Sequence, residues 1–317
     1  MLRADALEAL TNADGRPAFI AVGTFDGVHR GHRAVIDAML QAARAEAALA
    51  AVLTFVPHPL AVLRPDQAPE LLSSPDQRAR HLEALGVDAL VELRFDAALA
   101  EVAAVTFVQE YLCRRAGARR AFVGADFRFG ARATGTAEML AVLGRQACGL
   151  QTGIVPLVRA EGGTISSTRI RKALADGRPG LAARLLGHPF ALEGPVVAGE
   201  RRGRTIGFPT ANVVPPAGVA CPAPGVYAVR SRVDGGPWLA GIANLGRSPT
   251  VGPDRPLHLE VHLLGGFGDD LYGRRLEVAF VRRLRGERRF PDLEALRAQI
   301  AHDAARAQRL LLPSGSG

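Results

Sequence analysis

Gly23-Thr24-Phe25-Asp26-Gly27-Val28-His29-Arg30-Gly31-His32 is the stretch that decides the fold of the N-terminal half. It follows an apolar run at 19–22, which predicts a β-strand, and precedes a helical pattern at 33–48. Its glycines allow close approach of the backbone to a ligand, and a helix that starts near His32 directs unpaired N–H groups at an anion. His29 and His32 are three residues apart at that start, so both rings can reach one phosphate. The motif therefore favours phosphate binding over two histidines that merely cap turns.

Strand and helix patterns alternate from residue 19 to about residue 175. Such alternation predicts a parallel sheet with helices on both faces, and ligands of such sheets bind at the carboxyl ends of the strands. We therefore expect a Rossmann-like α/β domain over residues 1–186. Its expected strands are 19–22, 51–55, 89–95, 120–123 and 154–158, and its expected helices are 33–48, 74–86, 106–117, 136–148 and 167–175.

Residues 187–317 differ from the first part of the chain in composition and periodicity: glycine and proline become frequent, and long helical patterns stop. Short strands separated by turn residues predict an antiparallel β-barrel. Leucine and isoleucine at helical spacing predict a terminal helix over 292–312 that packs on the barrel. The expected strands are 196–198, 225–229, 239–243, 257–263 and 276–281.

The composition excludes several classes of protein. With 48% hydrophobic and 22% charged residues among 317, the chain can bury a core and is not generally disordered. The formal charge is 39 − 31 = +8, but the cations are dispersed arginines, and only 5% of residues are aromatic, which argues against a nucleic-acid surface. Lys172 is the one lysine in the sequence, so a lysine-dependent phosphate or Schiff-base site has a single place to occur.

The cysteines and the N-terminus indicate the compartment. Cys113, Cys148 and Cys221 form no CxxC pair and are odd in number, so we expect buried free thiols in a reducing environment. Residues 1–19 include acidic side chains and lack the apolar core of a signal peptide, and no apolar run reaches membrane-spanning length. We therefore expect a soluble, cytoplasmic protein without a membrane partner.

A second candidate phosphate site follows the last expected strand of the α/β domain. Residues 165–171, Ile-Ser-Ser-Thr-Arg-Ile-Arg, place hydroxyls at a helix start and two arginines one residue apart. Taken alone, the segment is a capped helix with surface arginines. The His-x-Gly-His pattern occurs in nucleotidylyltransferases and in class I aminoacyl-tRNA synthetases. The synthetases pair it with a lysine-rich second signature, which a chain with one lysine cannot supply.

The second domain has a glycine-rich segment at 199–212 that contains neither a phosphate-loop motif nor GxGxxG. The oxygen atoms of Thr210 and Asn212 suit Mg²⁺, which takes few protein ligands. A glycine-rich turn with a solvent-facing threonine fits the same spacing equally well.

Residues 258–262, His-Leu-Glu-Val-His, place His258, Glu260 and His262 on one face of a strand. One interpretation is a metal triad for zinc or non-haem iron. A second makes Glu260 a general base with a histidine as its hydrogen-bond partner. A third, which the sequence alone favours, is an exposed polar face. A zinc deaminase would also need Pro-Cys-x-x-Cys, and Cys221 has no such partner.

Taken together, these motifs resemble those of the bacterial bifunctional riboflavin kinases/FMN adenylyltransferases, also called FAD synthetases. The resemblance covers nearly the whole chain. In the first domain it rests on 23–32, Thr54-Phe55-Val56-Pro57-His58-Pro59, Gly124-Ala125-Asp126-Phe127-Arg128-Phe129-Gly130 and Ser166 to Arg171. In the second it rests on 207–212, Pro224-Gly225-Val226-Tyr227, Asn244-Leu245-Gly246, Glu260-Val261-His262 and Asp270-Leu271-Tyr272-Gly273.

The resemblance implies two reactions on flavins. The barrel would phosphorylate riboflavin to FMN with ATP and Mg²⁺, and the α/β domain would adenylylate FMN to FAD with release of pyrophosphate. It implies catalytic roles for His29, His32 and Glu260, the last as base for the flavin 5′-hydroxyl. The adenylyltransferase ATP site would contain Gly23, Thr24, Phe25, Asp26, Gly31, Ser167, Thr168, Arg169 and Arg171, and its flavin site Phe55, Pro57, His58, Asp126, Phe127 and Phe129. The kinase site would contain Gly203, Gly207, Pro209, Thr210, Asn212 and Asn244, with Thr210 and Asn212 at Mg²⁺.

Two departures from the family pattern fall on flavin-side loops of the kinase domain. Members usually read Asn-x-Gly-x-Arg-Pro-Thr, whereas residues 244–250 read Asn-Leu-Gly-Arg-Ser-Pro-Thr, with Ser248 at the usual arginine position. Gly265 stands where an aspartate or similar residue often follows the Glu-x-His motif. The alternative function is a flavin- or nucleotide-binding regulatory protein of the same fold that retains one activity. In either case we expect small-molecule substrates, no nucleic-acid partner, and a monomer or weak homo-oligomer.

Overall fold

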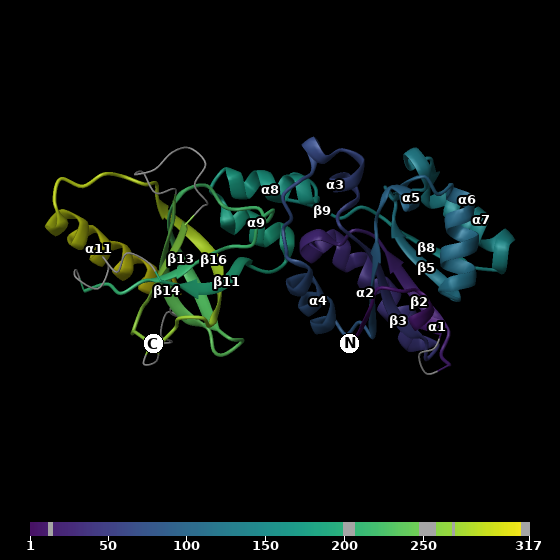
Figure 1. Cartoon of the computed structure of the whole chain (residues 1–317), viewed down its shortest axis with the longest axis horizontal. Helices are drawn as coiled ribbons and strands as arrows, with labels where there is room; N and C mark the ends of the chain where they lie inside the picture. The colour runs from purple at the N-terminus through teal and green to yellow at the C-terminus, as the bar shows by residue number, and fades with distance from the viewer. Residues whose placement is uncertain (12–14, 199–206, 247–257, 268–269, 312–317) are drawn as a thin grey trace. The chain divides into compact units, whose positions relative to one another are not determined.

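The chain folds into two compact units, residues 1–167 and 168–317, each with its own hydrophobic core. The structure is a computed structural model that describes residues 1–11, 15–198, 207–246, 258–267 and 270–311 (Figure 1). Among these residues, no helix combines the length and the apolar character needed to cross a membrane. The predicted boundary between residues 186 and 187 stays a prediction, since the compact units divide after Ser167.

In residues 1–167, apart from 12–14, a parallel sheet has the strand order β1-β4-β3-β2-β5-β8 (Figure 1). The strands are β1 (Leu2–Ala4), β2 (Ala18–Val22), β3 (Leu49–Val56), β4 (Ala89–Arg94), β5 (Ala118–Gly124) and β8 (Gln151–Val155). From β2 the chain moves outward to β3 and β4, and it then returns to β5 on the other side of β2. The strand order therefore reverses between β2 and β5, and ligands of open α/β sheets bind at such a reversal.

Helices cover both faces of this sheet, and alternate residues of β2 pack into the hydrophobic cores on the two faces. Phe19 and Ala21 pack with α2 (Arg30–Ala45) and α4 (Pro75–Ala84). Ile20 and Val22 pack in the other core, with α1 (Glu8–Thr11), the π-helix η3 (Phe107–Arg115) and α7 (Ala137–Cys148). Shorter elements are α3 (Pro59–Leu63), α5 (Ala97–Ala100), α6 (Ala104–Thr106), the 3₁₀ turns η1 (Asp26–Val28), η2 (Pro65–Gln67) and η4 (Ala131–Ala133), and the hairpins β6 (Arg128–Phe129)–β7 (Gly135–Thr136) and β9 (Arg159–Ala160)–β10 (Gly163–Thr164).

The predicted α/β fold is confirmed, and the differences lie at the edges of the sheet. Strand β1 was not predicted, because it has three residues and two of them are exposed. Strand β8 ends at Val155 instead of residue 158, because Pro156 has no N–H to donate to a ladder. The helix predicted over 106–117 is present as α6 and η3.

The prediction of buried free thiols is wrong for two of the three cysteines. Cys113 of η3 and Cys148 of α7 form a disulfide with their Cα atoms 6.0 Å apart, and Cys148 is exposed. Packing of α7 on η3 brings together residues that are 35 apart in sequence, which the number and spacing of cysteines cannot reveal. Cys221 keeps a half-buried thiol, 3.6 Å from the Val219 carbonyl.

Over the described part of residues 168–317, antiparallel strands close into a barrel in the order β11-β12-β15-β14-β13-β16 (Figure 1). They are β11 (Phe190–Val197), β12 (Ala211–Val213), β13 (Gly225–Val233), β14 (Leu239–Gly246), β15 (His258–Leu263) and β16 (Arg275–Arg285), and the helices are α8 (Ser167–Ala175), α9 (Pro179–Leu186) and α11 (Leu293–Leu311). Helix α11 packs on β13 and β14 through Ala307 and Leu311. The predicted barrel and terminal helix are confirmed, whereas the three-residue strand β12 was missed.

Candidate functional site

The loop after β2 holds an unusual backbone conformation. Phe25, Gly27 and Val28 all have positive φ angles, 48°, 76° and 41°, and only glycine adopts such angles without steric cost. The Thr54 hydroxyl donates to the Thr24 carbonyl at 3.0 Å and fixes the start of the loop. Strained backbone persists where its surroundings over-determine it, and it clusters at functional sites.

His29 and His32 stack on each other at the start of α2. Their ring centroids are 3.5 Å apart and the planes differ by 13°. His29 is the N-cap of α2, and its Nδ1 accepts the backbone N–H of His32 at 3.2 Å. A ring nitrogen that accepts a hydrogen bond carries no proton, so the proton of His29 is on Nε2. His29 is therefore a neutral hydrogen-bond donor.

The environment of His32 also favours the neutral ring. Burial holds the pKa of His32 well below its usual range, and the electrostatic interactions with the neighbouring His29 ring and with the Arg78 cation lower it further. The ring meets the edge of the Phe25 ring, with centroids 5.3 Å apart. Its Nδ1 is buried and has no hydrogen-bond partner among the described residues. At neutral pH the two histidines thus offer hydrogen bonds to an anion, without a full positive charge.

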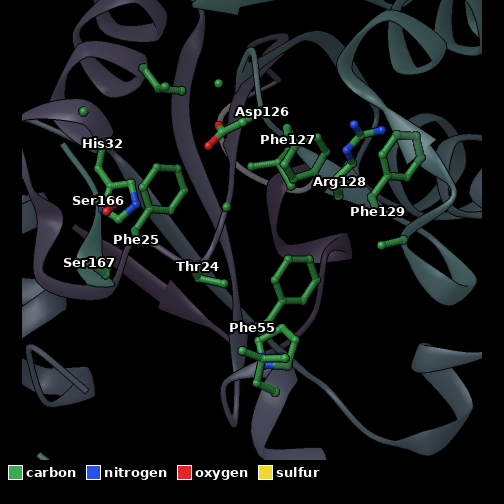
Figure 2. A pocket seen from close by; sticks show the side chains of 18 of the residues that line it. Thr24, Phe25, His32, Phe55, Asp126, Phe127, Arg128, Phe129, Ser166 and Ser167 are labelled. Atoms are coloured by element: carbon green, nitrogen blue, oxygen red, sulfur yellow. The ribbon is translucent and has the colours of Figure 1, made fainter. Parts of the chain in front are cut away.

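These rings form one wall of a pocket of about 810 Å³, which is within the size range of small-molecule sites. Residues at or beyond the carboxyl ends of β2, β3, β4, β5 and β8 line it, namely Val22, Gly23, Phe55, Phe95, Gly124, Asp126, Val155 and Pro156. Figure 2 shows His32, Phe25, Ser166 and Ser167 on one side, Phe127, Arg128 and Phe129 on the other, and Asp126 between them. The pocket therefore lies at the reversal of strand order, with a polar side and an aromatic side.

The polar side contains most of the residues predicted for ATP in this unit. Gly23, Thr24, Phe25, Gly31 and Ser167 line the pocket. The Ser167 hydroxyl donates to the Asp26 carbonyl at 3.3 Å. Asp26 itself is 2% exposed, and its carboxylate accepts the N–H of Leu72 at 2.7 Å, so it supports the loop from beneath. Thr168, Arg169 and Arg171 are in α8, within the second compact unit.

Four of the six residues predicted for flavin line the pocket: Phe127 and Phe129 on the aromatic side, Asp126 between the two sides, and Phe55 (Figure 2). The rings of Phe127 and Phe129 stack with centroids 5.5 Å apart. Pro57 and His58 are not among the lining residues; the Val56–Pro57 peptide is cis, and His58 caps α3 by accepting the N–H of Leu60. Sequence reasoning missed Phe95, Phe107, Leu63 and Arg64, which the fold brings to the pocket from outside the recognised motifs.

A row of polar side chains crosses three neighbouring strands of the barrel. Asn212 of β12 is paired with Glu260 of β15, and Glu260 is paired with Asn244 of β14. Residues directly opposite on antiparallel strands share a face, with Cβ atoms about 4.5–5.5 Å apart. Leu259 and Val261, the neighbours of Glu260, are buried. The row therefore lies on the outer surface of the barrel.

His262 connects this face to the glycine-rich segment that the family resemblance assigns to the kinase site. Its Nδ1 lies 2.9 Å from the Pro209 carbonyl, and its ring meets the edge of Phe208 with centroids 5.2 Å apart. Because a carbonyl only accepts, Nδ1 is the donor. The contact fixes Pro209 and the exposed Thr210 beside β15. Gly207 has a φ of 83° in this segment, while Gly203 and Ser248 lie outside the described residues.

The metal-triad interpretation of His258, Glu260 and His262 is not supported. In the described ranges, no group of three or more histidine, cysteine or acidic side chains is placed to hold a metal ion. The half-buried Glu260, between two amides, remains suited to accept a proton. After β15 the chain turns at Gly265 and Gly266, with φ angles of 93° and 76°, and aspartate would adopt the first of these angles only with strain.

Comparisons with known proteins cover both units. The family model of FAD synthetase matches residues 11–169 and that of riboflavin kinase matches residues 186–311. A bifunctional riboflavin kinase/FMN adenylyltransferase of Escherichia coli K12 is 41% identical over 303 residues, 94% of each chain. One of Bacillus subtilis is 36% identical over 295 residues, 92% of this chain and 91% of its own. A solved structure from Streptococcus pneumoniae, described as a macrolide-efflux protein, has a TM-score of 0.85 and 32% identity, covering 97% of this chain and 98% of that one. The chain belongs to the family of bifunctional riboflavin kinases/FMN adenylyltransferases.

Proposed function

We infer that the chain makes FAD from riboflavin in two steps, phosphorylation to FMN in the barrel and adenylylation of FMN in the α/β unit. One observation carries this inference: each unit holds its own candidate site, and the two sites differ in the side chains that they offer to a substrate. The first has the histidine pocket, and the second has the polar row around Glu260. Each site lies in the part of the chain that the corresponding family model matches.

For adenylyl transfer, we propose that the polar side of the pocket binds the phosphates of ATP and the aromatic side binds the flavin. An oxygen of the FMN phosphate attacks the α-phosphorus of ATP, the bond to the β-phosphate oxygen breaks, and pyrophosphate leaves. The Nε2–H of His29 and the N–H groups at the start of α2 supply hydrogen bonds to the reacting phosphate. No protein atom becomes bonded to substrate, so the rate comes from positioning and charge stabilisation. Thr168, Arg169 and Arg171 are proposed as further phosphate ligands.

For phosphorylation, we propose that Glu260 takes the proton of the riboflavin 5′-hydroxyl while that oxygen attacks the γ-phosphorus of ATP and ADP leaves. Asn212 and Asn244 flank the carboxylate and add no competing charge. The hydroxyl of the exposed Thr210 and the amide oxygen of Asn212 fit Mg²⁺, which prefers oxygen ligands and keeps several waters. Mg²⁺ bound there would neutralise negative charge on the phosphates of ATP.

We propose that the enzyme works in the cytoplasm, because both reactions consume ATP. We also propose that it acts as a monomer or weak homo-oligomer, and that it has no nucleic-acid partner. The dispersed arginines and the low aromatic content support the last point.

A product assay tests the proposal. The chain is incubated with riboflavin, ATP and Mg²⁺, and flavins are separated by chromatography; FMN should appear first and FAD afterwards. Glu260→Gln should stop FMN formation but still convert supplied FMN to FAD, and His29→Ala should do the reverse. Glu294→Gln and His302→Ala, at exposed positions of α11, are matched controls that should retain both activities. Flavin binding without either product would instead favour the regulatory alternative.

A further inference from the structure

Helix α4 is attached to the underside of the loop after β2. The Ser73 hydroxyl accepts the N–H of Gly27 at 3.1 Å in the buried segment that leads into the helix. Ser74 and Gln77 then form a capping box at the helix start. These contacts fix the first turn of α4 below the loop, and Arg78 follows directly after that turn.

Arg78 is a buried cation that reaches the loop from this helix. It is 5% exposed, and its Nη2 donates to Glu92 Oε1 at 2.8 Å. Its Nη1 lies 3.4 Å from the Thr24 carbonyl, the same oxygen that accepts from Thr54. Arginine is almost never buried unless it is paired. Of the two partners named here, one is the Glu92 carboxylate and the other is a carbonyl of the loop that lines the pocket.

We propose that Arg78 is a positioning residue for adenylyl transfer, which holds the carbonyl of Thr24 and thereby the loop that leads from β2 to the stacked histidines. The proposal rests on the pocket being the adenylylation site. It assigns Arg78 no contact with substrate, since Arg78 is not among the pocket-lining residues.

The backbone explains why such an anchor is needed. Thr24 directly precedes Phe25, the first of the residues with positive φ, and a non-glycine residue leaves that conformation readily unless its surroundings prevent it. Two donors on one carbonyl, from Thr54 and Arg78, oppose that relaxation. Loss of one donor should allow the loop to relax and should move the histidines away from the reacting phosphate.

The charge of Arg78 has a separate effect on His32. The ionisable groups that act on that ring are His29, the N-cap of the same helix, and Arg78 on α4. Of the nearby carboxylates, Asp126 lines the same pocket, and the buried Asp26 accepts the N–H of Leu72. Burial is the largest cause of the lowered pKa of His32, and His29 and Arg78 both add to it. Arg78→Gln, which removes the charge, should therefore show a higher His32 pKa, whereas Arg78→Lys, which keeps it, should titrate close to wild type. Loosening of the loop alone would expose His32 and raise its pKa in both variants.

The network around Arg78 offers a matched control. Glu92 also accepts from Arg3 of β1, through its Oε2 at 2.6 Å, and Arg3 reaches Asp76 at 2.8 Å. Glu92 thus keeps one cation when Arg78 is replaced, which protects the fold of the variant. Arg3→Gln removes the outer partner of the same carboxylate without touching the loop.

The experiment compares Arg78→Gln, Arg78→Lys and Arg3→Gln in the full chain. Arg78→Gln should lower kcat for FMN adenylylation at least about tenfold, the ratio expected for one charge-assisted hydrogen bond, with little change in KM for ATP and with unchanged riboflavin phosphorylation. Arg78→Lys should recover part of the loss, and Arg3→Gln should stay within about twofold of wild type. In NMR titrations of the histidine ring protons, with His32→Asn used for assignment, His32 should titrate at higher pH in Arg78→Gln than in wild type.

An adenylylation kcat of Arg78→Gln within about twofold of wild type, or an unshifted His32 titration, would overturn the proposal. If Arg78→Gln does not fold, the double variant Arg78→Gln/Glu92→Gln, which leaves no unpaired carboxylate, is compared with Glu92→Gln. An adenylylation kcat within about twofold of Glu92→Gln, or an unshifted His32 titration, would again overturn the proposal. If the wild-type chain forms no FAD from FMN, the assignment of the pocket fails, and the His32 titration still decides whether Arg78 acts on the ring.

Discussion

Replacing Gly31 by alanine should impair adenylyl transfer while leaving the protein folded. Gly31 lies in the first turn of α2, between the two histidines in sequence. A Cβ atom placed on it would lie 3.1 Å from Cε1 and 3.2 Å from Nδ1 of His29, which is closer than an ordinary van der Waals contact. The His29 ring has little room to yield, because its other side stacks on His32 at 3.5 Å between ring centroids.

Two opposing effects decide the stability of this variant. Alanine is favoured over glycine within a helix by up to about 1 kcal/mol. A shift of the His29 ring weakens its cap on the N–H of His32, and loss of an N-cap costs about 0.5–2 kcal/mol. The free energy of unfolding should therefore change by no more than about 1 kcal/mol in either direction.

Activity should change much more than stability. The added methyl group displaces the ring whose Nε2–H is proposed to face the phosphate, and a misplaced donor at a phosphoryl centre reduces the rate by about 10- to 100-fold. The assay measures kcat for FMN-to-FAD conversion and for riboflavin phosphorylation on the same sample. Gly180→Ala in α9 is the matched control, because a Cβ there meets no atom closer than 3.8 Å. Full adenylylation activity in a folded Gly31→Ala protein would refute the geometry described for His29.

Three further predictions concern stability. Gly194→Ala should destabilise the barrel by about 1–3 kcal/mol in thermal unfolding, because the new Cβ would collide with the Val214 carbonyl; an unchanged melting temperature would contradict this packing. The folded state lowers the pKa of His32, so the unfolded chain binds more protons than the folded chain as the pH falls. The free energy of unfolding should therefore decrease as the pH falls below about 6.5. In urea titrations, His32→Asn should show a smaller decrease than wild type. Asp303→Ala should cost about 3 kcal/mol in urea unfolding, because the 2%-exposed carboxylate pairs with Arg285 at 2.8 Å; a loss below about 1 kcal/mol would argue against that buried pair.

The elements that could be predicted from the sequence are those determined by residues within a single segment. Strand β2 is an apolar run that ends at a glycine-rich turn, and both the run and the turn can be recognised without knowledge of the rest of the chain. The same holds for Ser74, whose cap begins α4, and for Glu260, whose alternation with buried neighbours is visible in five residues. Such features depend on backbone periodicity and side-chain chemistry within one segment.

Features that depend on tertiary contacts could not be predicted in this way. The disulfide between Cys113 and Cys148 follows from the packing of α7 on η3. Phe95 and Phe107 reach the pocket because β4 ends and η3 begins beside it, although neither residue belongs to a recognised motif. Arg78 in the sequence is one of many dispersed arginines, and only the fold shows that it is buried beneath Thr24.

The central claim, two separate active sites in one chain, is tested most directly by mixing two inactivated proteins. Glu260→Gln alone, given riboflavin, ATP and Mg²⁺, should leave riboflavin unchanged, and His29→Ala alone should stop at FMN. An equimolar mixture should form FAD, because FMN made by the barrel of one protein can diffuse to the pocket of the other. Absence of FAD from the mixture, with each variant folded and its remaining activity intact, would contradict the assignment of the two reactions to the two sites.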